Sequence, residues 1–367
     1  MITSLTVDNY RCFKSLRLSD LKRINIIVGA NASGKTALLE SIKAGLTGLP
    51  FIIPWLNGLR GVATFIPPNP TPEQFQSQFV DIFHDFLSDS RIAIRFTDSD
   101  KRKASLEVFF DPRKAVTAQR QPPGFTASSA AQPPATSSVP TTTIIPLAFD
   151  RVTFQGEKSV LCATINAAGQ LYLEPGKEMG IPCGLFTMGY YGVPPENATW
   201  FSNLSKSKRS HEVMEAIQRH FPFIRQCSIE TEISGQSTVY VDITDLPRKV
   251  PLALVSSGIN RLFTLILALL TFSHGVALID EIENGIFHDQ YTQLWKTLDD
   301  LATRHDTQLF VSTHSIECLN AAVPIIKQSP DRFTLLQTRK QPDHAEIQVF
   351  QGVDLEQALA KGGEVRT

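Results

Sequence analysis

The sequence predicts an α/β protein in which a mostly parallel sheet has helices on both sides and carries an antiparallel β lobe and a small helical arm. Three short apolar runs support this prediction. Ile24–Val28 is followed by a glycine-rich loop, Val276–Ile279 by two acids, and Gln308–Val311 by small polar residues and a histidine. Such runs are typical of buried parallel strands, whose carboxyl ends form the ligand-binding edge of an open sheet.

The first run leads into the loop Gly29–Thr36, GANASGKT, which matches the phosphate-binding pattern G-x-x-x-x-G-K-[ST]. A helical pattern follows, so the loop has the flanking strand and helix that the motif requires. Gly29 and Gly34 allow backbone N–H groups to surround phosphate oxygens, and the helix directs its positive dipole end at them. We expect Lys35 to reach the β and γ phosphates and Thr36 to bind magnesium.

The second run ends in the adjacent acids Asp280 and Glu281. At the carboxyl end of a buried strand, Asp280 can hold a magnesium ion and Glu281 can polarise a water molecule. Taken alone, the two acids are equally consistent with solvated residues after a strand. Together with the phosphate-binding loop, they predict metal-assisted nucleotide hydrolysis.

Two further features bear on the class of hydrolase. His314 follows the third run and could reach a γ-phosphate, although a histidine after a strand is also often a surface residue or the neighbour of a helix cap. The small residues Ser256, Ser257 and Gly258 open an apolar helical stretch, Ile259–Phe272, and a helix N-terminus favours anions. These small residues are equally consistent with close helix packing.

The remaining elements are predicted from periodicity and composition. We expect two β hairpin segments at Arg91–Phe110 and Leu147–Glu174. Two strands are expected after a helical stretch, at Cys227–Ile233 and Thr238–Ile243, and two strands that close the sheet are expected at Phe333–Gln337 and Glu346–Phe350. The proline-rich composition of residues 113–146 favours a flexible insertion between the two hairpin segments.

We therefore expect a single domain over residues 1–367. Its expected parts are the N-terminal β lobe with the phosphate-binding loop (1–112), the insertion (113–146), the second β segment with a helical arm that presents Ser256–Gly258 (147–250), and the remainder of the site (251–367).

The order of these motifs resembles the ATP-binding-cassette ATPases of the RecF, SMC and OLD group, whose phosphate-binding-loop fold matches the α/β prediction. The segments IDEIENGIFH, THSIEC and the closing GGEVR are most similar to compact OLD-like ATPases, often called AAA fifteen proteins, which lack a toprim nuclease domain. These proteins occur in bacterial anti-phage and mobile-element systems. The resemblance covers residues 1–110 and 195–365.

The resemblance implies a role for individual residues. It implies nucleotide binding by Gly29, Asn31, Ser33, Gly34, Lys35, Thr36, Arg11, and the signature residues Ser256, Ser257 and Gly258. It makes Thr36 and Asp280 the magnesium ligands, and it makes Glu281 the general base, His314 the switch histidine and Lys35 a catalytic residue.

The chain also departs from the family pattern. Ala32 replaces a loop glycine and narrows the allowed backbone angles. Ser257 replaces a common signature glycine, and Ile259 stands where a polar residue is common. The glutamine loop has two candidate locations, either Gln74, Gln76 and Gln78 or the segment around Glu196 and Asn197.

Composition limits the class of protein. The chain has 367 residues, 42% of them hydrophobic, which is enough for one large or two modest cores. Its five scattered cysteines lack metal-site spacing and are typical of reduced thiols in a cytoplasmic protein. The most apolar segment, Leu262–Phe272, is far shorter than the roughly 20 residues that span a bilayer, so we expect no membrane partner, and no targeting segment is recognised.

The resemblance further implies ATP and Mg²⁺ as cofactors and a homodimer that sandwiches ATP, with a higher oligomer left open. It also implies a separately encoded effector protein, for which a nuclease is one candidate. A net charge of −1 does not require nucleic acid, and the basic groups at 101–103 and 206–209 are typical of solvated surface, so DNA stays open as a partner.

Two alternatives remain beside an ATPase that regulates an effector. One is a RecF-like DNA-repair ATPase, which DNA would stimulate. The other is an OLD-like nuclease component, which needs a toprim domain beyond the ATPase. Asp98 and Asp100 form a lone Asp-x-Asp pattern in a loop of the β lobe, and such a pattern is usually a solvated turn.

Overall fold

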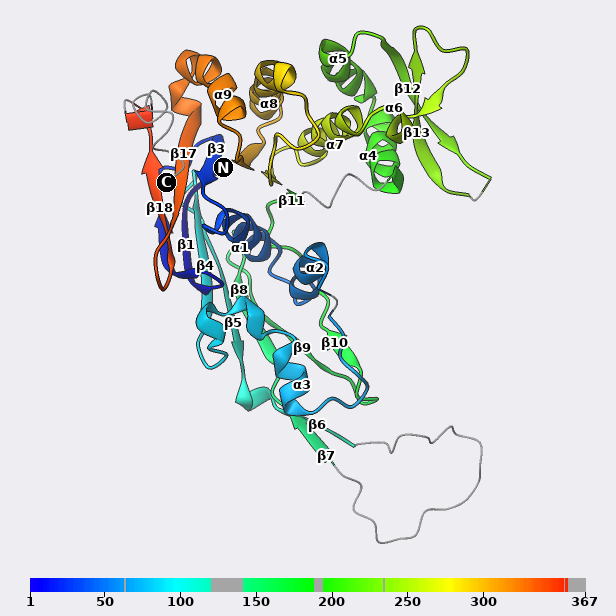
Figure 1. Ribbon diagram of the computed structural model, residues 1–367. Helices are drawn as coiled ribbons and strands as arrows, with labels where there is room; N and C mark the ends of the chain where they lie inside the picture. The colour runs from blue at the N-terminus through cyan, green and yellow to red at the C-terminus, as the bar shows by residue number, and fades with distance from the viewer. Residues whose placement is uncertain (63, 120–140, 188–193, 234, 353, 356–367) are drawn as a thin grey trace.

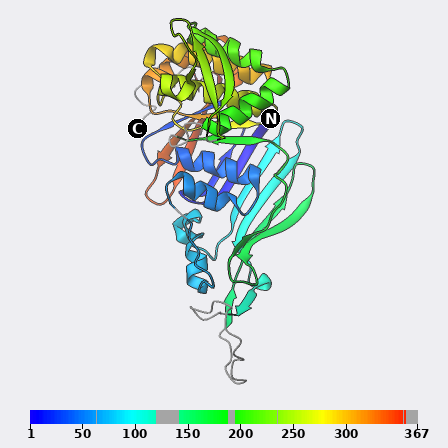
Figure 2. The same cartoon turned by 90° about the vertical axis from the view of Figure 1, so that its right-hand side faces the viewer.

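The computed structural model describes residues 1–62, 64–119, 141–187, 194–233, 235–352 and 354–355. Two large sheets form the body of the molecule, and a helical arm extends from one end of it (Figure 1). The same arrangement, turned by 90°, has the arm above, the α1–α2 pair in the middle and the antiparallel sheet beside it (Figure 2).

The first sheet has six strands in the order β11-β15-β16-β3-β17-β18. Its strands are β3 (Ile24–Gly29), β11 (Cys183–Phe186), β15 (Val276–Ile279), β16 (Gln308–Ser312), β17 (Phe333–Lys340) and β18 (Ala345–Phe350). The first five strands in the order are parallel and β18 is an antiparallel edge. β3, β11, β15 and β16 are buried at every position because both faces of the sheet are covered. The predicted mostly parallel sheet is confirmed.

Helices cover both faces of this sheet, as predicted. On one face lie α7 (Ser257–Thr271), α8 (Tyr291–Arg304) and α9 (Ile316–Gln328), and on the other lies α1 (Lys35–Thr47), followed by α2 (Ile52–Leu59). The side chains of β3 alternate between these faces: Ile24 and Ile26 belong to the core beneath α7–α9, whereas Ile27 packs in the core that contains α1. The phosphate-binding loop thus connects a central strand to a helix between the two sheets.

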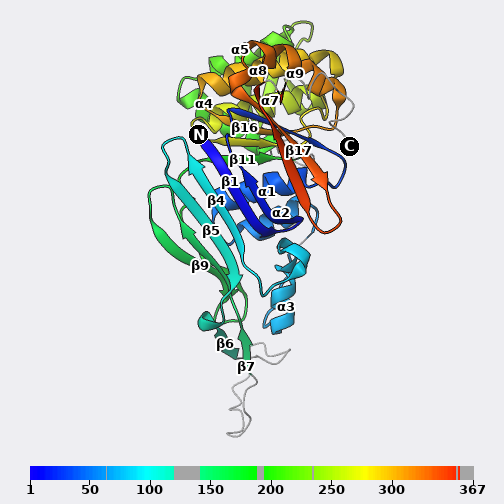
Figure 3. The same ribbon diagram turned by 90° about the vertical axis from the view of Figure 1, so that its left-hand side faces the viewer.

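The second sheet is antiparallel, with the order β10-β9-β8-β5-β4-β1-β2 (Figure 3). Its strands are β1 (Ile2–Tyr10), β2 (Phe13–Leu18), β4 (Ile92–Asp98), β5 (Lys103–Phe110), β8 (Leu147–Val152), β9 (Lys158–Ile165) and β10 (Leu171–Leu173). α1 packs tightly on it, since a Cβ at Gly45 would lie 2.6 Å from side-chain atoms of Ile94 and Phe96. The predicted antiparallel lobe, including both hairpin segments, is confirmed.

The arm consists of two longer helices, a small sheet and a four-residue helix. Its elements are α4 (Pro194–Lys206), α5 (Ser210–His220), β12 (Ile224–Thr231), β13 (Ser237–Ile243), β14 (Val250–Pro251) and α6 (Leu252–Val255). Val213 and Ile217 of α5 belong to the same core as α7, so the arm is packed onto the body. α6 leads directly into Ser256, the cap of α7.

The ends of the predicted insertion are more ordered than the sequence indicated. β6 (Val116–Gln119) pairs with β7 (Thr141–Ile144) in an antiparallel hairpin, so these residues are not part of a flexible loop. β-branched residues, which favour strands, account for the correction: Val116 and Thr117 in β6, and all four residues of β7. Residues 120–140 lie outside the described residues, as do residues 362–366 of the closing GGEVR segment.

Between α2 and β4 in the sequence lie α3 (Pro72–Ser77) and two short 3₁₀ turns, η1 (Val80–Ile82) and η2 (His84–Phe86). Asp98 ends β4 and accepts hydrogen bonds from the backbone N–H groups of Asp100 and Arg102, so the Asp98–Asp100 pair forms a hairpin turn. All five cysteines lie in the described part of the chain, and none is in a disulfide. In the described ranges, no helix is both long and apolar enough to cross a membrane.

Candidate functional site

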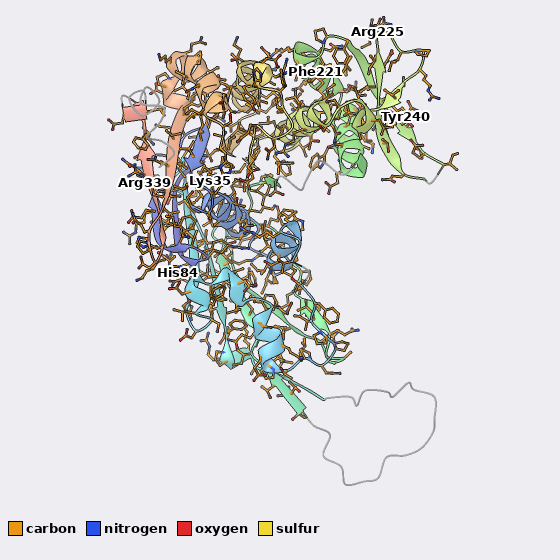
Figure 4. The ribbon with its side chains drawn as sticks, viewed as in Figure 1. Lys35, His84, Phe221, Arg225, Tyr240 and Arg339 are labelled. Carbon is orange, nitrogen blue, oxygen red and sulfur yellow. The ribbon has the colours of Figure 1, made fainter. Side chains whose placement is uncertain are left out.

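A cavity of about 690 Å³ opens at the carboxyl end of the six-stranded sheet. This volume is within the range of roughly 300–1,000 Å³ that is usual for ligand pockets. The phosphate-binding loop lines one part of it, and Glu281 and His314 reach it from the ends of β15 and β16. The β1–β2 turn, Arg60, Asp81, residues 83–86 and the β17–β18 turn, residues 340–345, line the rest. Lys35 and His84, which both line the cavity, are labelled in Figure 4.

The loop backbone needs its glycines. Gly29 has φ +147° and Gly34 has φ +106°, and both values lie in a region that side chains disfavour. A Cβ on Gly29 would lie 2.2 Å from Oγ1 of Thr338, and one on Gly34 would lie 3.0 Å from Sγ of Cys12. Ala32 adopts φ +59°, so alanine holds the left-handed conformation that glycine would take more easily.

Lys35 is held at the loop. It begins α1, is 4% exposed, and its Nζ donates to the carbonyl oxygens of Gly29 and Ala30, both at 2.8 Å. Burial lowers the pKa of Lys35, and the negative charges of Asp280 and Glu281 partly oppose that shift. An ammonium in this position can bind the phosphates of a ligand in the loop.

Asp280 and Thr36 come together as the sequence predicted. The Thr36 hydroxyl donates to Oδ2 of Asp280 at 2.9 Å, and the Ser312 hydroxyl donates to Oδ1 at 2.5 Å, which fixes the carboxylate from both sides. No cluster of three or more His, Cys, Asp or Glu side chains suited to a metal occurs among the described residues. A hydroxyl and one carboxylate nevertheless fit Mg²⁺, because Mg²⁺ prefers oxygen ligands and completes its shell with water and substrate phosphates.

Glu281 and His314 form a pair. His314 Nε2 lies 3.1 Å from Oε1 of Glu281, and the Asn284 amide donates to Oε2. Glu281 has φ +50°, and its backbone N–H donates to Oγ of Ser312 at 2.8 Å. A residue that is strained but tightly held, beside a cavity, is typical of a functional position.

Glu283 was not predicted from the sequence. Its Oε1 accepts hydrogen bonds from the backbone N–H groups of His314 at 2.6 Å and Ser315 at 3.0 Å. It thereby joins the segment after β15 to the segment after β16. In the sequence, the only sign of a role for Glu283 is that it is a third acid close to Asp280 and Glu281.

Arg11 lines the cavity as expected, but with two residues that the sequence did not identify. Its Nε lies 3.1 Å from Glu40, which is 2% exposed, and Arg60 donates to both oxygens of the same carboxylate at 2.7 and 2.9 Å. Arg60 also lines the cavity. One buried acid therefore orients two guanidinium groups at the cavity, although the three residues show no common sequence pattern.

The signature segment lies outside this cavity. Ser256 and Ser257 are exposed, and no residue of the segment lines the cavity. A Cβ on Gly258 would lie 2.3 Å from the carbonyl oxygen of Gly285, so close packing alone requires this glycine. Arg261 of the same helix is fully buried and donates to the Asp280 carbonyl oxygen at 3.2 Å, which links α7 to the end of β15.

Neither glutamine-loop candidate lines the cavity. Gln74 and Gln76 lie on α3, and Gln78 is the residue that ends it. Asn197 lies on α4, where its side-chain amide donates to Thr264 at 2.9 Å within the core. Both candidates occupy helical segments, and nothing in the described residues brings either of them to the phosphate-binding loop.

Comparisons with known proteins also indicate an ATPase. The chain matches the AAA_15 family, an AAA ATPase domain, over residues 1–142 and 199–319. An ATP/GTP phosphatase of Helicobacter pylori is 22% identical over 351 residues, which is 89% of each chain. The DNA replication and repair protein RecF of Acinetobacter baylyi is 44% identical over 50 residues, only 14% of each chain.

Among solved structures, an SMC head bound to the C-terminal winged-helix domain of ScpA is 14% identical, with a TM-score of 0.51 over 97% of this chain and 99% of that one. An SMC head with an extended coiled coil, bound to the C-terminal domain of ScpA derived from Pyrococcus furiosus, is 13% identical, with a TM-score of 0.50 over 100% and 99%. At this identity the similarity concerns the fold, which is that of an SMC head.

Proposed function

Because the chain belongs to the AAA ATPase domain family and is therefore an ATPase, we propose that it is a nucleotide-controlled dimerisation switch that regulates an effector protein. The observation that carries this proposal is the convergence of Lys35, the Thr36–Asp280 pair and the Glu281–His314 pair on one cavity. These residues supply a phosphate-binding cation, oxygen ligands for a metal and a carboxylate base.

The proposed chemistry follows from these side chains. Lys35 and the loop N–H groups bind the β and γ phosphates. Thr36 and Asp280 would hold Mg²⁺, which would supply positive charge to neutralise the same phosphates. Glu281 orients the attacking water and takes its proton. His314 holds Glu281 at 3.1 Å and lies where it can contact the γ-phosphate.

The dimer is proposed because the signature segment has no phosphate to bind within its own chain. Ser256 and Ser257 are exposed at the start of α7, and the described structure gives that helix no side-chain cap. The uncapped N–H groups favour an anion. A second copy that presents its phosphate-binding loop to this helix would supply the γ-phosphate, so ATP would hold two copies together and hydrolysis would release them.

We infer only the class of the effector, a separately encoded protein. Two similar structures are SMC heads bound to ScpA, which supports a separately encoded protein partner for this ATPase as well. The AAA fifteen resemblance supports an anti-phage role, and the cysteine usage supports a cytoplasmic location. The ATP/GTP phosphatase relative supports GTP as a second substrate.

A RecF-like function is the second candidate, and the 50-residue similarity to RecF favours it. DNA that stimulates ATP hydrolysis would support that candidate over effector regulation. A nuclease function is not proposed, because Asp98 and Asp100 form a hairpin turn on the antiparallel sheet.

The experiment uses Glu281→Gln, which keeps the shape of the side chain but removes the base. We expect ATP binding to persist, turnover to fall by about two to four orders of magnitude, and an ATP-dependent dimer to accumulate. Light scattering with and without ATP and Mg²⁺ measures the dimer. Lys35→Ala is the matched control and should neither bind ATP nor dimerise. A Glu281→Gln protein that stays monomeric with bound ATP would contradict the switch.

A further inference from the structure

The 81–86 segment lines the cavity with an aromatic residue that the phosphate chemistry does not use. Phe86 is 65% exposed and lines the cavity together with the phosphate-binding loop. Its neighbour Phe83 is 1% exposed and stacks on Phe110, with ring centroids 6.0 Å apart. Phe83 therefore serves the core, whereas most of the Phe86 side chain is left accessible.

The backbone at Phe86 is strained. Asp85 has φ +52° and Phe86 has φ +58°, so two consecutive residues that are not glycine occupy the left-handed region. A left-handed conformation is unfavourable for a bulky side chain and persists only where the surrounding structure imposes it. Strain of this kind, at a cavity, is typical of a residue that is positioned for a ligand.

The segment is held in place by three contacts with the β1–β2 turn. The Arg11 N–H donates to the Ile82 carbonyl oxygen at 2.9 Å, and His84 Nδ1 donates to the Arg11 carbonyl oxygen at 2.8 Å. Tyr10 and Phe83 form an isolated antiparallel bridge. These contacts tie the backbone just before Phe86 to Arg11, and Phe86 and Arg11 both line the cavity.

We infer that Phe86 binds the nucleobase: its ring stacks on the base of a nucleotide whose phosphates are bound by Gly29–Thr36. The inference rests on the proposed nucleotide site. Once the loop binds the phosphates, the ribose and base extend into the remainder of the cavity, which the 81–86 segment and the β17–β18 turn enclose. The turn contributes the polar residues Lys340, Gln341 and His344, whereas Phe86 offers an accessible aromatic side chain.

Stacking does not depend on the identity of the base, because every base has a π face. We therefore expect Phe86 to contribute to the binding of ATP and GTP alike, and to contribute nothing to the binding of phosphates alone. This separates the role of Phe86 from that of Lys35, which acts on the phosphates.

Calorimetric titration of the full chain with ATP, GTP and inorganic tripolyphosphate tests the inference. Phe86→Ala should weaken ATP and GTP binding roughly 5- to 100-fold and leave tripolyphosphate binding unchanged. Phe86→Tyr should bind all three like the wild type. Leu87→Ala is the matched control, since Leu87 is 55% exposed but does not line the cavity, and it should bind all three like the wild type.

Unchanged ATP affinity in Phe86→Ala, with normal ATP and tripolyphosphate binding by the wild type, would overturn this inference and leave the nucleotide site intact. The same result combined with loss of the ATP-dependent dimer would show that Phe86 contacts the second copy instead. A wild-type protein that binds neither ATP nor tripolyphosphate would overturn the proposed function together with the inference.

Discussion

At the residue scale, Glu283 connects the two carboxyl-terminal edges of the site. One of its oxygens accepts both the His314 and the Ser315 backbone N–H groups. Ser315 in turn caps α9 by accepting from the Cys318 N–H at 3.0 Å. The Glu283 carboxylate therefore determines where His314 lies relative to Glu281. Glu281 is two residues before Glu283 in the sequence.

We predict that Glu283→Ala lowers the free energy of unfolding by about 2 kcal/mol, because two partly buried N–H groups lose a charged acceptor. Turnover should fall as well, because His314 loses its anchor beside Glu281. Urea unfolding and steady-state ATPase assays measure the two effects. Glu283→Gln keeps an acceptor oxygen and should retain most of the stability. Wild-type stability in the alanine variant would show that water or another group replaces Glu283.

Two residues of the site that are not glycine have a strained backbone. Ala32 and Glu281 both occupy the left-handed region, at φ +59° and +50°, which costs roughly 1–2 kcal/mol for each residue. Both lie in segments fixed by other contacts, such as the hydrogen bond from the Glu281 N–H to Ser312. The surrounding structure therefore imposes these conformations.

At the element scale, the β17–β18 hairpin is a wall of the site as well as the edge of a sheet. Thr338 of β17 donates to the Val28 carbonyl oxygen at 3.0 Å and contacts the hydroxyl of Ser33. The Ala345 N–H, where β18 begins, donates to the Cys12 carbonyl oxygen at 2.8 Å. The hairpin thus supports the phosphate-binding loop from a position about 300 residues away in sequence.

The β6–β7 hairpin joins the two ends of residues 120–140. Gln119 of β6 pairs with Thr141 of β7, so the two residues that flank 120–140 are cross-strand neighbours. We predict that replacing residues 120–140 with Asn-Gly leaves the melting temperature and ATPase rate nearly unchanged, because Asn-Gly suits a two-residue hairpin turn and a shorter loop closes at a lower entropic cost.

Thermal unfolding and ATPase assays of this variant test the prediction. The control is an insertion of the same Asn-Gly pair after Asp100, in the β4–β5 turn, where Asp98 accepts two backbone hydrogen bonds that the insertion would disturb. A large loss of stability on replacing residues 120–140 would mean that they pack against the domain.

At the scale of the whole molecule, the phosphate-binding loop and the proposed signature segment lie in different places on one chain. The phosphate-binding loop lies between the two sheets, whereas Ser256–Gly258 lie where the arm joins α7 and do not line the cavity. The helix α7 still contacts the site, since Arg261 donates to the Asp280 carbonyl oxygen. A ligand bound at the start of α7 could therefore influence the end of β15.

We predict that Ser257→Arg abolishes hydrolysis while sparing ATP binding, because an exposed arginine at the start of α7 would block a second copy without touching the bound nucleotide. Calorimetry measures ATP binding, and turnover measured against protein concentration tests the need for a dimer. Thr271→Arg, an exposed position at the other end of α7, is the matched control and should keep full turnover. Full specific activity of Ser257→Arg at every dilution would exclude the sandwich mechanism.

The sequence by itself determined the central strands, the phosphate-binding loop and the acids after β15. These features depend on local rules: a buried parallel strand requires a continuous apolar run, and the loop requires glycine at fixed positions before a helix. For the same reason, the arrangement of His314 after β16 followed from the parallel order of the strands. The prediction of a flexible insertion was wrong at Gln119 and Thr141, which pair in a hairpin. It was based on the average composition of residues 113–146 and missed the strand-forming residues at the two ends of that segment.

Only the tertiary structure decided which distant residues complete the cavity. Glu40 brings Arg11 and Arg60 together, and Phe86 reaches the cavity from a surface turn that no periodicity predicts. Such contacts depend on how α1 and the two sheets pack, and packing joins residues far apart in sequence without leaving a local pattern. The position of the signature segment outside its own cavity was likewise decided by the placement of α7 on the far face of the parallel sheet.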